Sequence, residues 1–429
     1  MTELGSRAAE GGGLRPTGTG SVQPGEAASP PRDGTRHRPY HRPHHRTYDE
    51  ARKRAGRLAG TYGRAVLAVL PAWIVARVLV AVSLILAHLL VNVVRPHNPG
   101  ARLRVHQGLL AWDGGWYEAI AGHGYSAAGQ QSVRFFPAFP MAARVLGGIP
   151  GIGVDTALVL MANVCALAAM AALLVLVRHD LGDPGLARRS VWLLALAPSA
   201  YCLVLGYSDA VLLLCSVVTV LAARTGRWWW AAGAGLAAGL VRPVGVLLVV
   251  PVLIEVWLSR RSDPTVGRWT ARMAAVAGPL AGLGIFLGWV DHQFGDAWLP
   301  FQVQEQVGRR GNLAFPVSAM AHNVASLFHG HHVGSALHVP WVLLCLFLLV
   351  VAFRKLPLSY AALATVMLAV SLTSSNLDSF ERYALGAFPL IVAASTLTSG
   401  RRAEVVVLVL AGVGMVGYAV LAFLGVVVP

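Results

Sequence analysis

The sequence predicts an all-α protein that crosses a membrane several times. Of its 429 residues, 55% are hydrophobic and only 13% are charged, and the mean hydropathy is +0.59. A soluble chain of this length has too little polar surface to cover so much apolar area. Apolar runs separated by short basic segments recur along the chain, as in polytopic proteins with cytoplasmic turns. We therefore expect a bundle of about 10 or 11 transmembrane helices.

The first 60 residues predict a disordered basic tail in the cytoplasm. They hold 11 Lys and Arg against 6 Asp and Glu, with many Gly and Pro and almost no large apolar side chain. Such a segment cannot bury enough surface to fold. Its His/Arg run at 36–46 is read as contact with anionic lipid headgroups rather than as a metal tract. The formal net charge of +15 lies mostly in this tail and in the short turns, so nucleic acid is not an expected partner.

Residues 61–429 predict one multi-spanning domain. The first apolar run, at about 64–94, fits a tilted helix whose one internal charge, Arg77, faces either a helix interface or a polar cavity. Further runs follow at about 155–177, 190–206, 208–223, 229–241, 243–257, 271–290, 338–353, 356–373, 384–398 and 403–428. Several are too short to cross about 30 Å of hydrocarbon. Broken helices are therefore expected near Gly206 and Arg242, and the stretch 137–150 reads equally as a crossing or a re-entrant turn.

Three polar segments are expected on the outer side, at about 95–136, 291–340 and 374–383. Because they share one end of the bundle, they can form a single cavity there. The second segment contains five histidines: His322, His329, His331, His332 and His338. No paired carboxylate or second ligand cluster accompanies them at a fixed spacing, so neither a metal site nor a cofactor is predicted.

The strongest chemical signal is one carboxylate among aromatic side chains just after the first apolar run. Asp113 stands between Trp112 and the Trp116-Tyr117 pair, and two glycines follow it directly. A carboxylate there can accept the proton of a substrate hydroxyl, and the aromatic faces can stack on a sugar. The alternative is that Asp113 only caps the helix that begins beside it. Glu118, about one turn later, either faces the same cavity or is a solvated helix residue.

These residues stand in an ordered series that resembles the PIG-V family. The series runs from Trp-Asp at 112–113 through Trp-Tyr at 116–117 and Gly-Tyr at 124–125 to FFPAFP at 135–140. Further matches are APSA at 197–200, YSD at 207–209, RWW at 227–229, RPVG at 242–245, FGDAWLPF at 294–301, RY at 382–383 and FP at 388–389. The PIG-V family comprises the second mannosyltransferases of GPI-anchor assembly and their bacterial relatives, within the GT-C class of multi-spanning glycosyltransferases.

The resemblance implies a GT-C-like bundle with outward-facing catalytic loops in the cell membrane. It implies transfer of mannose from polyprenyl-phosphate mannose, with inversion, to a hydroxyl of a cell-envelope glycolipid, glycan or protein, with Asp113 as the general base. An arginine can stabilise the lipid-phosphate leaving group. The candidates, in order, are Arg382, then Arg309, Arg310 and Arg134.

Each of these residues also has a plainer interpretation. An arginine beside a membrane helix can be an anchor for lipid headgroups. Asp209 lies at a helix break, where it either lines the cavity or only makes a turn, and Arg242 reads as a residue of the kink at Pro243. The competing functions are a transporter or lipid flippase, and a GT-C transferase that uses another lipid-linked sugar.

Overall fold

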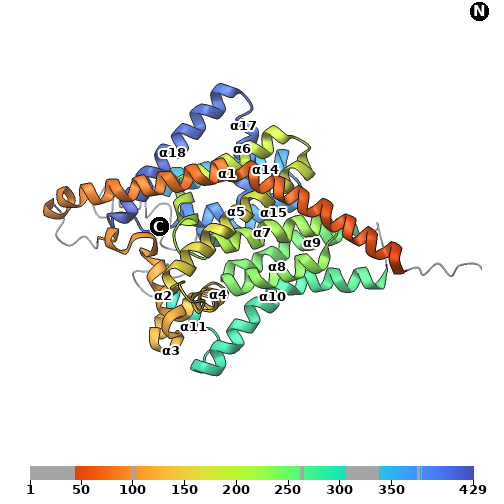
Figure 1. Cartoon of the computed structure of the whole chain (residues 1–429), viewed down its shortest axis with the longest axis horizontal. Helices are drawn as coiled ribbons and strands as arrows, with labels where there is room; N and C mark the ends of the chain where they lie inside the picture. The colour runs from red at the N-terminus through yellow and green to blue at the C-terminus, as the bar shows by residue number, and fades with distance from the viewer. Residues whose placement is uncertain (1–43, 98–102, 261–264, 306–337, 374–376, 378) are drawn as a thin grey trace, which may run out of the picture. The chain divides into compact units, whose positions relative to one another are not determined.

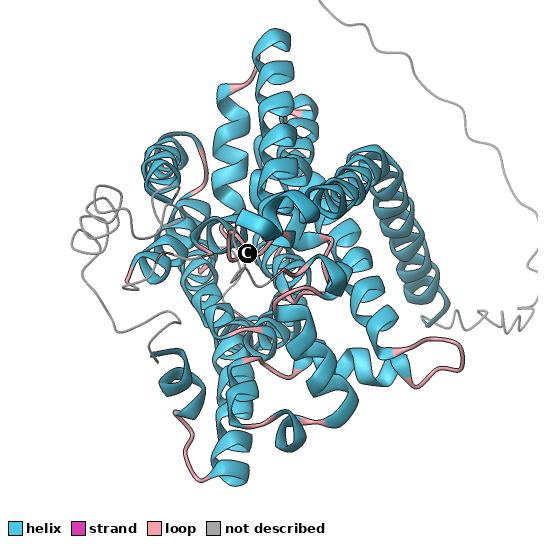
Figure 2. Cartoon of the chain, turned by 90° about the vertical axis from the view of Figure 1, so that its left-hand side faces the viewer, coloured by secondary structure: helices cyan, strands magenta, loops and turns pink. Residues whose placement is uncertain are grey.

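A computed structural model describes the chain except at residues 1–43, 98–102, 261–264, 306–337, 374–376 and 378. Within the described residues all regular secondary structure is helical (Figure 2), which confirms the predicted all-α class. Contacts divide the chain into residues 1–54 and a compact unit, Ala55–Pro429. The cavity and all the side-chain contacts discussed below belong to the second unit.

Within the described ranges, most neighbouring helices are joined by short turns (Figure 1). The α-helices are α1 (His44–His97), α2 (Asp113–His123), α3 (Tyr125–Ala128), α4 (Ala138–Gly147), α5 (Val154–Leu181), α6 (Pro184–Leu196), α7 (Asp209–Arg224), α8 (Trp228–Val241), α9 (Val249–Ser259), α10 (Val266–Phe294), α11 (Leu299–Glu305), α14 (His338–Lys355), α15 (Leu358–Leu372), α16 (Phe380–Gly386), α17 (Phe388–Leu397) and α18 (Arg401–Phe423). In the part of the chain that the structure describes, four 3₁₀ segments lie between these helices: η1 (Val105–Leu110), η2 (Gln130–Arg134), η3 (Pro198–Leu203) and η4 (Pro243–Leu248).

Among the described residues, five helices are long and apolar enough to cross a membrane. They are Gly60–Val93 within α1, and α5, α10, α14 and α18. The apolar helices of 10–17 residues, including α8, α15 and α17, fall short of the roughly 20 residues that one crossing needs. These lengths support a multi-pass membrane protein, while the expected 10 or 11 crossings stay a prediction. The helix α4, which covers most of the ambiguous stretch 137–150, has only 10 residues.

Both expected helix breaks are present. The chain leaves α6 through η3 and reaches α7 only at Asp209, so the backbone around Gly206 is not α-helical. The helix α8 ends at Val241, and Pro243 opens η4, because proline cannot donate the hydrogen bond that would continue α8. These two breaks matter because each places a charged side chain, Asp209 or Arg242, inside the bundle.

Arg77 lies in a helix interface. Of the two positions that the sequence allowed, a helix interface or a polar cavity, the first is the one observed. Its Nε donates to the side-chain oxygen of Asn163 on α5 at 2.8 Å, and its Nη2 donates to the carbonyl of Leu203 at 3.3 Å. The guanidinium also stacks over the Trp73 ring at 4.3 Å. An arginine on an apolar helix is tolerated where its donors are satisfied in this way.

Glycines bring α8 and α10 into close contact, and Figure 1 shows the two helices side by side. A Cβ atom added at Gly282 would collide with the carbonyl oxygen of Leu236 and would approach the Leu240 nitrogen to 3.0 Å. Small residues at such positions let membrane helices approach closely. Two residues along the same helix, Gly284 has nothing within 4 Å of an added Cβ.

We expect Gly282→Val to destabilise the protein by about 1–3 kcal/mol or more, because the new side chain meets rigid backbone. Gly284→Val is the matched control, since it places the same side chain on the same helix in open space. Thermal unfolding of both variants in detergent measures the difference. Equal melting temperatures for the two variants would show that the α8–α10 contact does not contribute as described.

Candidate functional site

Asp113 is the first residue of α2, and its carboxylate points to another helix rather than capping its own. The N-cap position is occupied by Trp112, and no side chain caps this helix end. Oδ2 of Asp113 instead accepts a hydrogen bond from Nη1 of Arg382 on α16 at 2.6 Å. The side chain of Asp113 remains 29% exposed. The interpretation of Asp113 as a simple helix cap is therefore wrong.

Arg382 is buried and holds two carboxylates at once. Its Nη1 pairs with Asp113, and its Nε and Nη2 both lie near Oδ2 of Asp209, at 2.9 and 2.7 Å. The guanidinium carbon also lies 4.4 Å from the centre of the Tyr207 ring. With only 4% of its surface exposed, Arg382 does not reach lipid headgroups, so the anchor interpretation is wrong for this residue.

Arg242 extends these contacts into a chain of ion pairs. Oδ1 of Asp209 accepts a hydrogen bond from Nη1 of Arg242 at 2.5 Å. Asp113, Asp209, Arg242 and Arg382, called the ion cluster from here on, come from four separate parts of the sequence and sum to zero formal charge. Pairing of this kind is what allows charges to remain ionised away from water.

The ion cluster shifts the pKa values of Asp209 and Arg382. Burial alone raises the pKa of the Asp209 carboxyl group, but the guanidinium groups of Arg242 and Arg382 outweigh burial and leave that pKa below its ordinary value. Burial lowers the pKa of Arg382, and the two facing carboxylates raise it well above its ordinary value. Asp209 and Arg382 therefore stay charged near neutral pH.

The lowered pKa of Asp209 makes the stability of the folded protein depend on pH in a predictable direction. Because the Asp209 pKa is lower in the folded than in the unfolded chain, its ion pairs stabilise the fold above about pH 4 and lose that contribution as pH falls through the folded pKa. The difference in melting temperature between the wild type and Asp209→Asn should be constant from about pH 7 to about pH 5 and should shrink below about pH 4. A difference that shrinks above about pH 5 would contradict the assigned direction.

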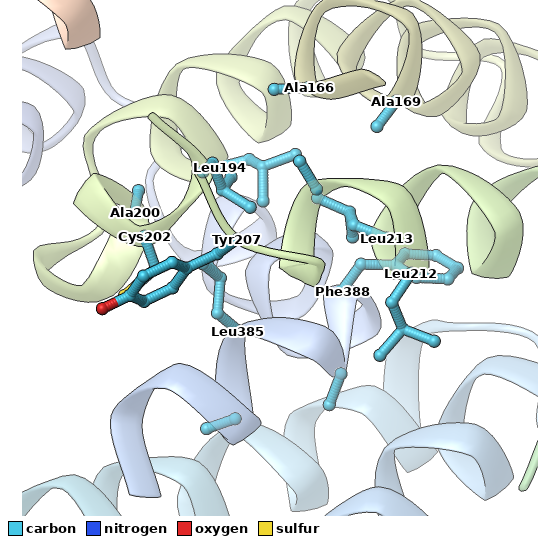
Figure 3. Packing of buried hydrophobic residues seen from close by; sticks show 14 of the residues in the cluster. Ala166, Ala169, Leu194, Ala200, Cys202, Tyr207, Leu212, Leu213, Leu385 and Phe388 are labelled. Atoms are coloured by element: carbon cyan, nitrogen blue, oxygen red, sulfur yellow. The ribbon is translucent and has the colours of Figure 1, made fainter. Parts of the chain in front are cut away.

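Two tyrosines fix the backbone around both aspartates. The hydroxyl groups of Tyr117 and Ser208 lie 2.6 Å apart, and the Tyr207 hydroxyl donates to the carbonyl of Ala111 at 2.9 Å. Burial raises the pKa of Tyr117, so its hydroxyl stays protonated. Figure 3 shows Tyr207 on the turn before α7, beside buried side chains that include Cys202 and Leu385. This packing holds the start of α2 against the start of α7.

A cavity of about 910 Å³ opens on the ion cluster. That volume lies near the top of the range of about 300–1,000 Å³ for small-molecule sites. One part of its lining is polar and aromatic: Arg104, Trp112, Asp113, Trp116, Tyr117, Arg134, Phe135, Phe136, Gln304, Ser379, Arg382 and Tyr383. The aliphatic part of the lining consists of residues most of which flank Arg242 in the sequence: Val241, Pro243, Val244, Val246, Leu247, Leu283 and Val370. The cavity thus suits a ligand with both a polar head and an apolar chain.

Most of the predicted site residues meet in this place. Trp112, Asp113, Trp116, Tyr117, Arg134 and Arg382 line the cavity, and Asp209 lies behind it in the ion cluster. Glu118 is exposed and is not part of the cavity lining. Arg309 and Arg310 lie outside the described residues.

No group of three or more potential metal ligands occurs in the part of the chain that the structure describes. Of the five histidines considered as a metal tract, only His338 belongs to that part. Its Nδ1 lies 2.7 Å from Oε1 of Glu381, in the buried interior.

Sequence reasoning missed the role of Arg242. Its neighbour Pro243 does break the helix as predicted, but the guanidinium also joins the ion cluster and stacks over Tyr383 at 5.2 Å. Arg104, whose guanidinium lies 4.7 Å from the Trp112 ring centre, was missed as well. The available signal was the position of Arg242 at a break between two short apolar runs, where an unpaired charge would be costly.

Comparison with models of known protein families and with characterised proteins gave no match. The geometry of the cavity and of the ion cluster therefore carries the functional argument that follows.

Proposed function

We propose that the protein is an integral-membrane mannosyltransferase that resembles the PIG-V family of the GT-C class. It transfers mannose from polyprenyl-phosphate mannose to a hydroxyl of a cell-envelope acceptor. The observation that carries this proposal is a single cavity lined by one accessible carboxylate, Asp113, by two tryptophans, Trp112 and Trp116, and by the buried arginine that pairs with Asp113. A proton acceptor, sugar-stacking faces and positive charge are the groups that such a transfer needs.

Asp113 acts as the general base. One of its oxygens is held by Arg382, and the other has no hydrogen-bond partner among the described residues. That free oxygen accepts the proton of the acceptor hydroxyl while the hydroxyl oxygen forms its bond to the anomeric carbon of mannose. The bond from this carbon to the phosphate oxygen breaks in the same step, so the anomeric configuration inverts and polyprenyl phosphate leaves.

The aliphatic part of the lining receives the donor. An isoprenoid chain that lies along residues 243–247 brings its phosphate to Arg242, which stands at the start of that segment. Arg242 and Arg382 then provide positive charge where the leaving phosphate gains its second negative charge. Trp112 and Trp116 line the cavity and offer aromatic contact to the two sugars.

The proposed setting is the cell membrane, with the amino-terminal tail in the cytoplasm and the cavity on the outer face. This orientation follows from the basic residues of the tail and of the turns, as the positive-inside rule requires. The partners are then the lipid-linked donor, the envelope acceptor and the bilayer itself.

Transfer of radiolabelled mannose from polyprenyl-phosphate mannose into membrane acceptors tests the proposal. Membranes that contain the protein should incorporate label above membranes from a deletion strain, and EDTA should not abolish the difference. Incorporation equal to the deletion background would reject mannose transfer. Incorporation from another polyprenyl-phosphate sugar instead would keep the transferase class and change the donor.

A further inference from the structure

Two arginines that line the cavity are not members of the ion cluster and have no carboxylate partner there. Four arginines line the cavity, namely Arg104, Arg134, Arg242 and Arg382. The charges of Arg242 and Arg382 are matched by Asp209 and Asp113. Neither Arg104 nor Arg134 pairs with a carboxylate in the part of the chain that the structure describes. The polar part of the cavity therefore carries two positive charges in excess.

These two guanidinium groups are held in place before any ligand binds. Arg104 stacks over Trp112 and donates from Nη1 to the Gln107 side chain at 3.5 Å, which is a long contact. Arg134 lies over Trp116 at 5.2 Å and over Phe135 at 4.6 Å. The Nε atoms of both are buried and lack a hydrogen-bond partner within the described residues. Stacking fixes the plane of a guanidinium and leaves its N–H edge for an oxyanion.

Their position relative to Asp113 suggests which substrate they meet. Trp112 and Trp116 are four residues apart at the start of α2, and Asp113 lies between them in the sequence. The acceptor is the substrate whose hydroxyl must reach Asp113, so it occupies this part of the cavity. The proposed donor phosphate belongs beside Arg242, on the aliphatic part of the lining. A second anion near α2 thus belongs to the acceptor.

We propose that Arg104 and Arg134 form an anion subsite for the acceptor, and that the acceptor carries an acidic group, a phosphate or a carboxylate, close to its reactive sugar. This inference rests on the proposed function, because it identifies the class of the second substrate of the same cavity. It excludes a neutral glycan as the preferred acceptor.

A matched pair of soluble acceptors tests the subsite. The probes are 2-hydroxyethyl α-mannoside and the same compound phosphorylated on the hydroxyl of its hydroxyethyl group, which leaves all sugar hydroxyls in place and the phosphate close to the sugar. In transfer assays with labelled donor, the wild type should prefer the phosphorylated probe by about tenfold or more in kcat/KM. In Arg104→Gln and Arg134→Gln the ratio should fall toward one. Arg354→Gln, an exposed site at the end of α14, should keep the wild-type ratio.

A binding measurement separates this inference from the proposed function. Purified wild type in neutral detergent should be stabilised against heat more by the phosphorylated than by the neutral probe, and both arginine variants should lose that difference. If the wild type transfers no mannose but shows this difference, the proposed function fails and the anion subsite stands.

Equal stabilisation of the wild type by both probes overturns the subsite. An arginine variant that raises KM for the donor and keeps the acceptor preference also overturns it, because the arginine then belongs to the donor phosphate.

Discussion

Replacement of Asp113 by asparagine should reduce mannose transfer by roughly 10²–10⁴-fold, the range expected for loss of a general base. An amide has nearly the same shape as the carboxylate, but it cannot take the proton of the acceptor hydroxyl. The ion pair with Arg382, whose Nη1 lies 2.6 Å from Oδ2 of Asp113, is lost as well. The rate of transfer at saturating donor is the quantity to measure.

The matched control is Asp155→Asn. Asp155 is also an acidic residue in the first turn of a helix, but it is exposed and is not part of the cavity lining. This variant should retain the wild-type rate. If Asp113→Asn kept the wild-type rate too, Asp113 would not be the base and the ion cluster would be structural.

Replacement of Arg382 by glutamine should remove activity and also destabilise the fold by about 3–5 kcal/mol, the usual consequence of breaking a buried ion pair from one side. The change leaves Asp209 buried with Arg242 alone and releases Asp113 from its partner. Denaturant unfolding in detergent measures the loss.

A double variant shows whether the loss comes from the ion cluster. Asp209→Asn together with Arg382→Gln should be less destabilised than the sum of the two single variants, because the unpaired carboxylate is then removed. The control for an exposed ion pair is Arg188→Gln. Arg188 pairs with Glu404, but its side chain is 60% exposed, so the expected cost is about 1 kcal/mol or less. Additive losses in the double variant would mean that Asp209 and Arg382 do not depend on each other.

Much of the helical arrangement could be predicted from the sequence, because apolar runs and prolines act locally. The break at Pro243 and the separate start of α7 at Asp209 follow from a missing backbone donor and from a polar turn between apolar segments. The number of crossings could not be predicted in this way. Helices such as α8, with 14 residues, are as apolar as true spans but shorter than the hydrocarbon layer.

The contents of the site could be predicted only in part, because ion pairing joins residues that are far apart in the sequence. Asp113 was found from its aromatic neighbours, and Arg382 from its position after a polar segment. That Arg382 holds Asp113 and Asp209 together depends on how α2, α7 and α16 meet, for which a single sequence contains no local signal. The role of Arg242 could not be predicted for the same reason. The neighbouring Pro243 already explained the helix break, so the sequence contained no separate indication of an ion pair at Arg242.

The most direct test of the central claim uses purified protein in liposomes that contain polyprenyl-phosphate mannose, labelled in the sugar, and a lipid extract of envelope acceptors. We expect one polyprenyl phosphate to be released for each mannose transferred, with the anomeric configuration inverted. Recovery of the labelled donor intact, whether in its original leaflet or moved to the opposite one, would contradict the claim. Movement without transfer would identify the protein as a lipid transporter.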